Sequence, residues 1–380
     1  MRIFVSEFIT SGALSGESLP PSLLREGEAM CSAVIADLTA LPDICVVTTR
    51  DLRLPHPADA RDPKLIYESV KSAEDEKTAF DRMVMASDAT LVIAPETNGE
   101  LEHRVQRVID RGKRVLNCQP EAIRLCADKL KLAEHFAAHK IPTIRTLLAD
   151  LGSEPWRLAA RGKRGQTLSG HTISELNRQL PKGSDPFCHG LPVEGGCVLK
   201  PRDGAGSWLT FGIPFRDGKA WQSAVSDIAR HGMSDRMILQ PWIAGRALSV
   251  GCLCHSSGQI EILPIACQRI KGDRFEYRGG EIPAEISLTS KQQIEDLVTR
   301  ACQSIAGLYG YIGIDLLLSE DESANALIVE INPRLTTSYV GYRRACHSNL
   351  ASRIMESGDW SSRLTWKSEK VVFQADGSHS

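Results

Sequence analysis

The chain has 380 residues, enough for two or three domains with a large buried core. Its composition, 42% hydrophobic and 24% charged, is that of a globular protein and excludes disordered, collagen-like and coiled-coil classes. The formal charge of −2 gives the whole molecule no field that favours nucleic acid or an anionic membrane. We therefore expect neither as a partner, and any anion-binding site must be local.

The first 120 residues alternate short apolar segments with segments of helical period. They predict strands at 3–8, 44–49, 89–95 and 114–118, and helices at 21–41, 75–86 and 100–112. This alternation indicates an α/β domain with a small parallel sheet. The N-terminus lacks the apolar stretch of a signal peptide and no run of 18 apolar residues occurs, so we expect a cytoplasmic protein.

The pattern changes near residue 126. A helix with Asp128 as its N-cap is expected to end before Pro142. The polar segment 161–195 predicts loops around a short helix at 174–180. Beyond it we expect a long helix at 291–308, a tail from 367, and antiparallel strands at 197–201, 237–243, 248–254, 260–268, 311–318 and 326–334.

A lysine at a strand end precedes a loop without bulky side chains. Lys200 ends the strand, and the loop consists of Gly204, Ala205, Gly206 and Ser207. Backbone N–H groups of such a loop can bind phosphate oxygens, and the lysine adds a point charge. The spacing matches neither the P-loop nor the dinucleotide fingerprint. A surface hairpin with a solvated lysine is the alternative.

Two later strands carry oxygen-bearing side chains. Asp315 lies in one, while Glu330 and Asn332 lie in the next, two residues apart and on one face. These oxygens suit Mg²⁺ or Mn²⁺ together with nucleotide phosphates. Arg334, on the same face, is suited to hold a carboxylate or a transferring phosphoryl group. Buried salt bridges between these acids and arginines are the alternative.

Taken in order, the motifs over about residues 125–340 resemble the ATP-grasp superfamily of carboxylate–amine ligases. The resemblance implies an ATP-grasp fold: an N-terminal parallel-sheet domain, and two domains of α+β type that clasp the nucleotide. We expect an N-terminal α/β domain at 1–122, a small ATP-grasp domain at 123–241, a C-terminal ATP-grasp domain with the metal site at 242–366, and a tail at 367–380.

The resemblance also implies roles for individual residues. The helix "ADKLKLAEHF" would place Lys129 on the ATP phosphates, and "CVLKPRDGAGS" would place Lys200 and the loop 204–207 there. "GIDLLL" and "EINPR" resemble the metal strands, which puts Arg334 near the acyl phosphate and makes Asp315, Glu330 and Asn332 the ligands of Mg²⁺.

The segment "ILQPWIAGRALSV" resembles the hinge between the two ATP-holding domains, so Gln240, Trp242 and Ile243 would line the adenine pocket. Pro241 stands where some relatives have lysine, and its carbonyl still accepts a hydrogen bond. Many relatives have a ribose-binding glutamate two residues after the hinge glycine, where this chain has Ala247. The ribose contact must then come from elsewhere, or the base and phosphates hold the nucleotide.

Within the superfamily, "FVSEFITSG" and "QRIKGDRFEYRGGEIP" look most like the tyramine–glutamate ligase branch. By this resemblance the substrate contacts are Arg269, Tyr277, Gly279 and Gly280. An ordinary hairpin with one exposed arginine is the alternative interpretation of that segment.

The implied activity is formation of an amide from a carboxylate and an amine through an acyl phosphate, with ATP and Mg²⁺. Glutamate and a tyramine- or tyrosine-like amine are the expected small-molecule substrates. Two alternatives remain: a ligase for another amino acid, a peptide or polyglutamate, and a nucleotide-binding protein without turnover, which the loss of the ribose acid favours. Superfamily members are often dimers, so both a monomer and a homodimer stay open.

Overall fold

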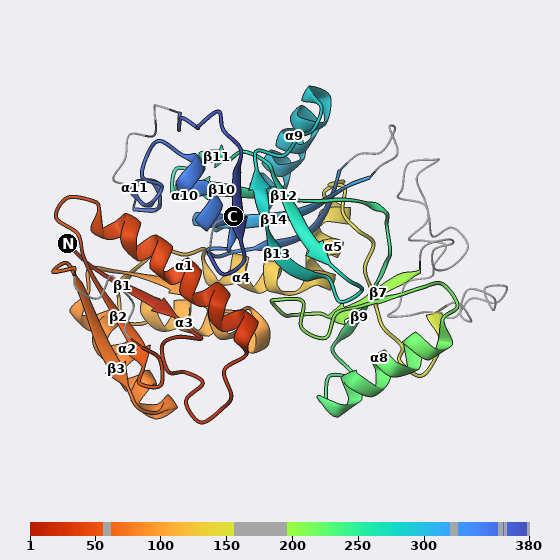
Figure 1. Cartoon of the computed structure of the whole chain (residues 1–380), viewed down its shortest axis with the longest axis horizontal. Helices are drawn as coiled ribbons and strands as arrows, with labels where there is room; N and C mark the ends of the chain where they lie inside the picture. Colours follow the sequence, from red (N-terminus) through yellow and green to blue (C-terminus); the bar gives the residue numbers. More distant parts are fainter. Residues whose placement is uncertain (56–61, 156–195, 320–325, 356–359, 361–362, 378–380) are drawn as a thin grey trace.

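Three β-sheets organise the chain in this computed structural model, which describes residues 1–380 except 56–61, 156–195, 320–325, 356–359, 361–362 and 378–380. The parallel sheet and the smallest sheet lie toward opposite ends of the long axis, and the largest sheet lies between them (Figure 1). The loops and short helix predicted at 161–195 fall outside the described residues.

The first sheet is parallel and has the order β3-β2-β1-β4-β5. Its strands are β1 (Arg2–Glu7), β2 (Cys45–Asp51), β3 (Leu65–Val70), β4 (Ala89–Ile93) and β5 (Arg114–Val115). Strand β3 has no counterpart among the predicted strands, because it lies at the sheet edge, where its outer side chains are exposed and the apolar pattern is weak. The predicted α/β organisation of this region is confirmed.

Two helices of this region begin at residues that favour a helix start. They are α1 (Pro21–Thr39), α2 (Ala73–Ala86), the 3₁₀ helix η2 (Thr97–Gly99) and α3 (Glu100–Ile109). Pro21 stands at the first position of α1, where a missing N–H costs nothing, and the Ser72 hydroxyl caps α2.

The second sheet is antiparallel, with the order β6-β9-β7-β8. It contains β6 (Leu147–Leu148), β7 (Cys197–Pro201), β8 (Phe211–Ile213) and β9 (Met237–Pro241), and helix α8 (Gly218–Arg230) covers it. Helices α4 (Pro120–Ala127) and α5 (Lys129–Ala138) precede it. Helix α8 was not expected, although Trp221, Ala224 and Ile228 follow helical spacing and Asp217 caps it.

The third sheet is antiparallel and follows the order β15-β14-β10-β12-β13-β16, with β11 paired to β10. Its elements are β10 (Gly245–Cys254), β11 (Ile260–Ile262), β12 (Ala266–Lys271), β13 (Glu276–Ile282), β14 (Gly310–Ser319) and β15 (Leu327–Asn332), with helices α9 (Leu288–Ser304), α10 (Ser338–Ala345) and α11 (Ala351–Ile354). The single strand predicted at 260–268 is two, because Pro264 cannot donate to a ladder.

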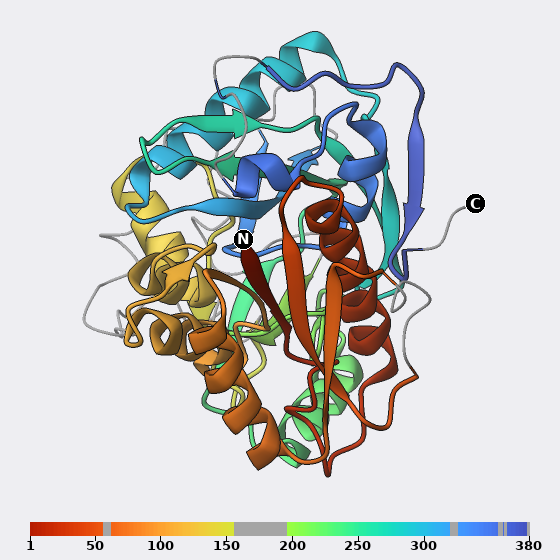
Figure 2. The same ribbon diagram turned by 90° about the vertical axis from the view of Figure 1, so that its left-hand side faces the viewer.

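The segment 367–380, expected as a tail, contributes strand β16 (Val371–Gln374), which pairs with β13. Figure 2 shows β16 at the outer edge of the third sheet, near α1. The domain boundaries given above stay a prediction: the one at 241/242 lies between β9 of the second sheet and β10 of the third, whereas the one at 366/367 separates β16 from the sheet to which it pairs. No helix among the described residues has the length and apolar character needed to cross a bilayer.

Candidate active site

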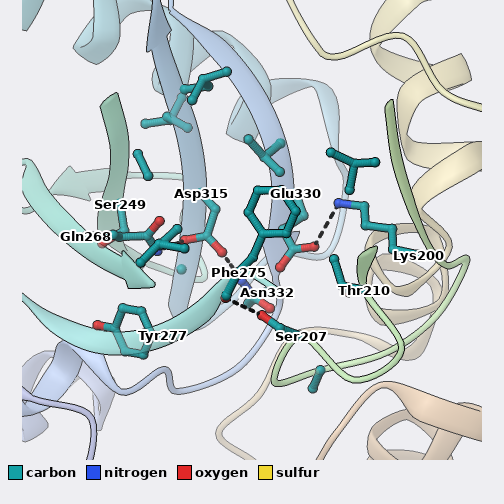
Figure 3. A pocket seen from close by; sticks show the side chains of 18 of the residues that line it. Lys200, Ser207, Thr210, Ser249, Gln268, Phe275, Tyr277, Asp315, Glu330 and Asn332 are labelled. Atoms are coloured by element: carbon teal, nitrogen blue, oxygen red, sulfur yellow. Dashed lines mark hydrogen bonds and ion pairs between the residues drawn. The ribbon is translucent and has the colours of Figure 1, made fainter. Parts of the chain in front are cut away.

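A cavity of about 550 Å³ lies between the second and third sheets, with α1 and α5 contributing to its wall. Figure 3 shows part of its lining. The structure brings most of the predicted site residues to this cavity: Lys129, Lys200, Gly204, Ala205, Gly206, Ser207, Gln240, Trp242, Ile243, Tyr277, Asp315, Glu330, Asn332 and Arg334.

Local contacts at the start of α5 bring the two lysines together. Asp128 caps the helix by accepting from the Lys131 amide, and its carboxylate also accepts two hydrogen bonds of 2.6 Å from the Arg202 guanidinium. The Lys129 amide donates to the Arg202 carbonyl at 3.0 Å. Arg202 follows β7, the strand that carries Lys200, so these bonds fix the helix to the end of that strand. Both lysines then point into the cavity.

Glu330 lies opposite the lysines on β15. Its Oε2 is 3.4 Å from Lys129 Nζ and 4.0 Å from Lys200 Nζ, and Lys129 Nζ also donates to the Gly204 carbonyl at 3.1 Å. The glycine loop, the helix and the third sheet therefore meet at one ammonium group. Two cations this close suit a polyanionic ligand.

Asp315 and Glu330 are directly paired across strands β14 and β15, and their carboxyl groups are within hydrogen-bonding reach of each other. Asp315 accepts from Gln268 Nε2 at 2.8 Å and from Asn332 Nδ2 at 3.2 Å (Figure 3). The register explains the grouping, because directly opposed residues share a face of the sheet.

Burial and neighbouring charges set the protonation of this group. Burial, together with the Glu330 charge, raises the pKa of Asp315 to about 7. Burial would also raise the pKa of Glu330, but the charges of Lys129 and Lys200 lower it to about 2. Burial lowers the pKa of Lys200 to about 8 even though Glu330 opposes that shift. Near neutral pH Asp315 therefore titrates while Glu330 stays ionised.

These oxygens fit a divalent cation. Repulsion between the two carboxylates contributes to the raised pKa of Asp315, and a cation held between them would offset it. No cluster of three or more His, Cys, Asp or Glu side chains that could hold a metal occurs among the described residues. Asp315, Glu330 and Asn332 therefore make a partial oxygen set, which suits Mg²⁺ because that ion takes its remaining ligands from phosphates and water.

Arg334 lies on the cavity wall but is already engaged. Its Nε and Nη2 donate to the two carboxylate oxygens of Glu96 at 2.9 and 3.1 Å, and Nη1 donates to the Leu335 carbonyl at 3.2 Å. Both side chains of this pair are buried. Glu96 follows β4, so the first sheet orients an arginine of the third.

Contacts across the cavity mouth join the second sheet to the β12–β13 hairpin. The Ser207 hydroxyl donates to the Phe275 carbonyl at 2.9 Å, and the Gly212 amide donates to the Asp273 carbonyl at 2.7 Å. The rings of Trp242 and Phe275 lie 5.7 Å apart. These contacts hold the glycine loop and β8 against the hairpin.

The glycine loop also approaches the first sheet. Gly206 has a φ of 66°, and a Cβ atom there would lie 2.6 Å from Leu23 Cδ2 on α1. This close approach and the left-handed backbone explain why a glycine occupies the position.

The hinge residues differ in how they can contact a base. The Gln240 side chain is buried and donates to Thr146 Oγ1 at 2.8 Å, and the Trp242 amide donates to the Gly196 carbonyl at 3.1 Å. Both groups are therefore committed to the protein. Ala247 lines the cavity as well and offers only a methyl group.

Three of the four expected substrate residues lie outside the cavity lining. Arg269 is exposed and paired with Glu281 at 2.7 Å. Gly279 and Gly280 pair with β16, and a Cβ atom on Gly279 would lie 2.1 Å from the Phe373 carbonyl oxygen. The structure explains both glycines by strand packing. Only Tyr277 lines the cavity.

Sequence reasoning missed two acids that the structure places here. Glu26 on α1 lines the cavity, and Glu96 holds Arg334. Glu96 carried a usable signal, since it comes three residues after a buried strand of a parallel sheet, where ligand sites form. Glu26 carried none, because an acid on an amphipathic helix normally faces solvent.

Comparison with known proteins identifies the class to which this arrangement belongs. A family model described as an ATP-grasp domain matches residues 126–338, and one described as a pre ATP-grasp 3 domain matches residues 44–123. The first match covers more than half of the chain, so the chain belongs to the ATP-grasp family. The predicted family and fold are confirmed.

The chain is also similar to individual ligases. The chain is 28% identical over 139 residues to tyramine–L-glutamate ligase of Methanocaldococcus fervens, covering 37% of this chain and 43% of the relative. It is 27% identical over 160 residues to D-alanine–D-alanine ligase of Phocaeicola vulgatus, covering 40% and 46%. These matches span less than half the length of either relative.

Solved structures agree on the fold. An ATP-grasp superfamily protein from Archaeoglobus fulgidus aligns with a TM-score of 0.65 at 21% identity, covering 98% of this chain and 92% of that one. An L-amino acid ligase from Bacillus licheniformis aligns with a TM-score of 0.60 at 14% identity, covering 94% and 73%.

Proposed function

We propose that the chain is an ADP-forming ligase that uses ATP and Mg²⁺ to join a carboxylate to an amine. One observation carries the proposal: Lys129 and Lys200 converge within 4.0 Å of Glu330 in a cavity bounded by the glycine loop 204–207 and a carboxylate pair. This arrangement combines cations for phosphates with oxygens for a metal. Family membership supports the same interpretation.

In the proposed reaction the γ-phosphoryl group of ATP passes to the substrate carboxylate, the amine then attacks the acyl carbon, and phosphate leaves. The two lysines and the loop amides would hold the triphosphate and offset its charge, which is most of what phosphoryl transfer needs. Arg334, oriented by Glu96, would face the transferred group. Mg²⁺ held by Asp315, Glu330 and Asn332 would neutralise phosphate oxygens. The contacts across the cavity mouth would keep water from the acyl phosphate.

The substrates we propose are glutamate and a tyramine-like amine, because two relatives at 28% and 31% identity are tyramine–L-glutamate ligases. A ligase for another amino acid or a peptide is the alternative, which the likeness to D-alanine–D-alanine ligase favours. A nucleotide-binding protein without turnover is the remaining candidate, and Ala247 at the ribose position is the observation that favours it.

The test is product analysis with purified protein, ATP, Mg²⁺ and pairs drawn from a set of carboxylates and amines. We expect ADP and phosphate only when both cosubstrates are present. AMP as the product would contradict acyl-phosphate chemistry. If the protein binds ATP but forms no ADP with any pair of cosubstrates, the non-catalytic alternative is favoured.

Variants assign the roles. Lys200→Ala and Glu330→Gln should each lose at least about 100-fold in kcat, the scale found for a group that stabilises transition-state charge. Lys219→Ala, an exposed lysine of the same region, is the matched control. Full activity in either site variant would contradict the assigned role.

A further inference from the structure

An acid from the first sheet's side reaches the cavity at the end away from the lysines. Glu26 is in the second turn of α1 and lines the cavity. The third sheet meets it through the Thr337 hydroxyl, which donates to Glu26 Oε2 at 3.3 Å. Helix α1, which packs against the first sheet, thus completes the part of the cavity wall formed by the third sheet.

The position of Glu26 matches the ligand-binding edge of a parallel sheet. In the order β3-β2-β1-β4-β5 the chain leaves β1 on one side for β2 and returns on the other side for β4. The crevice outside the carboxyl ends of β1 and β4 is where such sheets bind ligands. Glu7 ends β1 and Glu96 follows β4, so three acids gather at this edge.

Only one of these acids is left for a ligand. Glu7 accepts from the amides of Ile9 and Thr10 at 3.2 and 2.7 Å, and Glu96 is neutralised by Arg334. Glu26 accepts one hydroxyl and, among the described residues, forms no ion pair within 4.0 Å. The Arg334 guanidinium, which already binds Glu96, also attracts Glu26, so one cation serves two acids, and a cationic ligand would reduce the cost of the second, half-buried carboxylate. Burial raises the pKa of Glu26 even though the charges of Arg334 and Arg25 and the Thr337 hydroxyl oppose that shift.

Tyr277 supplies a second polar group at the same end. It lies on the side of the Asp315–Glu330 pair away from Lys200 (Figure 3). Its phenol oxygen is shielded from solvent and has no hydrogen-bond partner within 3.5 Å in the described part of the chain, although Ser338 is close enough to influence its pKa. Burial raises the pKa of Tyr277, the Ser338 hydroxyl opposes that shift, and the charges of Asp315 and Glu26 add to it. A donor from a ligand would satisfy the phenol oxygen.

We propose that Glu26, with Tyr277 beside it, binds the ammonium group of a substrate at the end of the cavity opposite the phosphate-binding lysines. This inference rests on the proposed function and deepens it by defining one substrate as an ammonium compound. The ammonium belongs either to an α-amino acid that supplies the carboxylate or to the amine that attacks it. Glu26 and Tyr277 provide a charge and a neutral acceptor, the partners that an ammonium group requires.

The experiment compares ligands that differ only in the ammonium group. Calorimetry would measure binding of glutamate against glutarate, and of tyramine against 4-hydroxyphenylethanol, to the wild type and to Glu26→Gln with ATP analogue and Mg²⁺ present. Glu17→Gln, an exposed acid just before the same helix, is the control.

We expect the wild type to favour one ammonium ligand over its partner by about 10- to 100-fold, the usual worth of a charged hydrogen bond. Glu26→Gln should lose that preference, while its affinity for the ATP analogue stays within about twofold. A preference in the glutamate pair assigns the ammonium to the acid substrate, and a preference in the tyramine pair assigns it to the amine.

Two results would overturn the inference: a wild type that discriminates in neither pair, or a Glu26→Gln variant that keeps the discrimination. Neither result depends on turnover, so it is distinguishable from failure of the proposed ligase activity. Conversely, absence of ADP with every pair would reject the ligase and leave the binding result standing. Tyr277→Phe should weaken the same ligand by a smaller factor than Glu26→Gln.

Discussion

The buried charge of Lys200 is expected to lower the free energy of unfolding of the protein. Its ammonium group is buried on β7, and burial lowers its pKa from the ordinary 10.5 to about 8. At about 1.36 kcal/mol for each pKa unit, that difference corresponds to about 3 kcal/mol by which the folded chain disfavours the charged form. The attraction of Glu330 is already included, because it acts on the same pKa. At pH 7 the group is charged, so the folded protein carries this cost.

Replacing the charge by an apolar chain of similar length should remove the cost. Lys200→Met is therefore expected to raise the free energy of unfolding at pH 7 by about 3 kcal/mol while abolishing turnover. Urea unfolding followed by fluorescence measures the first effect and ADP release the second. Lys219→Met, at an exposed position on α8, should change neither.

The pH dependence has a definite sign. The folded state releases the Lys200 proton near pH 8, whereas the unfolded chain keeps it until about 10.5, so this group makes the wild type more stable as pH rises between those values. The advantage of Lys200→Met should shrink over the same interval. A variant less stable than the wild type, or an advantage that does not change with pH, would refute the reasoning.

Glu96→Gln breaks a buried bidentate pair with Arg334, so it should lower the free energy of unfolding in urea by about 3 kcal/mol and should also lower kcat. Glu285→Gln, whose side chain is 80% exposed, should change neither quantity. Equal effects of the two variants would argue against a role for burial. Gly279 has a φ of 108°, and a Cβ atom there would lie 2.1 Å from a carbonyl oxygen, so Gly279→Ala should lower the free energy of unfolding by about 3 kcal/mol. Gly258→Ala, at a position with open space, should lower it by about 1 kcal/mol. Thermal unfolding measures both, and equal losses would contradict the packing account. The Mg²⁺ concentration for half-maximal ADP release should be higher at pH 6 than at pH 8, since Asp315 takes up a proton near pH 7, and a constant value would contradict its place in the metal set.

Local pattern was enough for the elements with strong periodicity. The apolar runs of β1, β4 and β14 and the capped start of α5 were all predictable, because each is decided by residues close together in the chain. Weakly patterned elements were not. Strand β3 lies at a sheet edge, and β16 is held by pairing with β13, so neither has a strong signal of its own.

For the candidate site, the sequence by itself determined which residue types occur at the strand ends and in the glycine loop, and the order of motifs determined the family. It could not decide which side chains face the same cavity. Glu26, Glu96 and Arg334 meet only because α1, the end of β4 and the end of β15 pack together. Arg269 lies outside the cavity lining because side chains alternate along β12, where its neighbours Gln268 and Ile270 face the cavity. Distances between elements depend on packing across the whole chain, and that is why the tertiary structure alone decided where charge is paired and where it is left for a ligand.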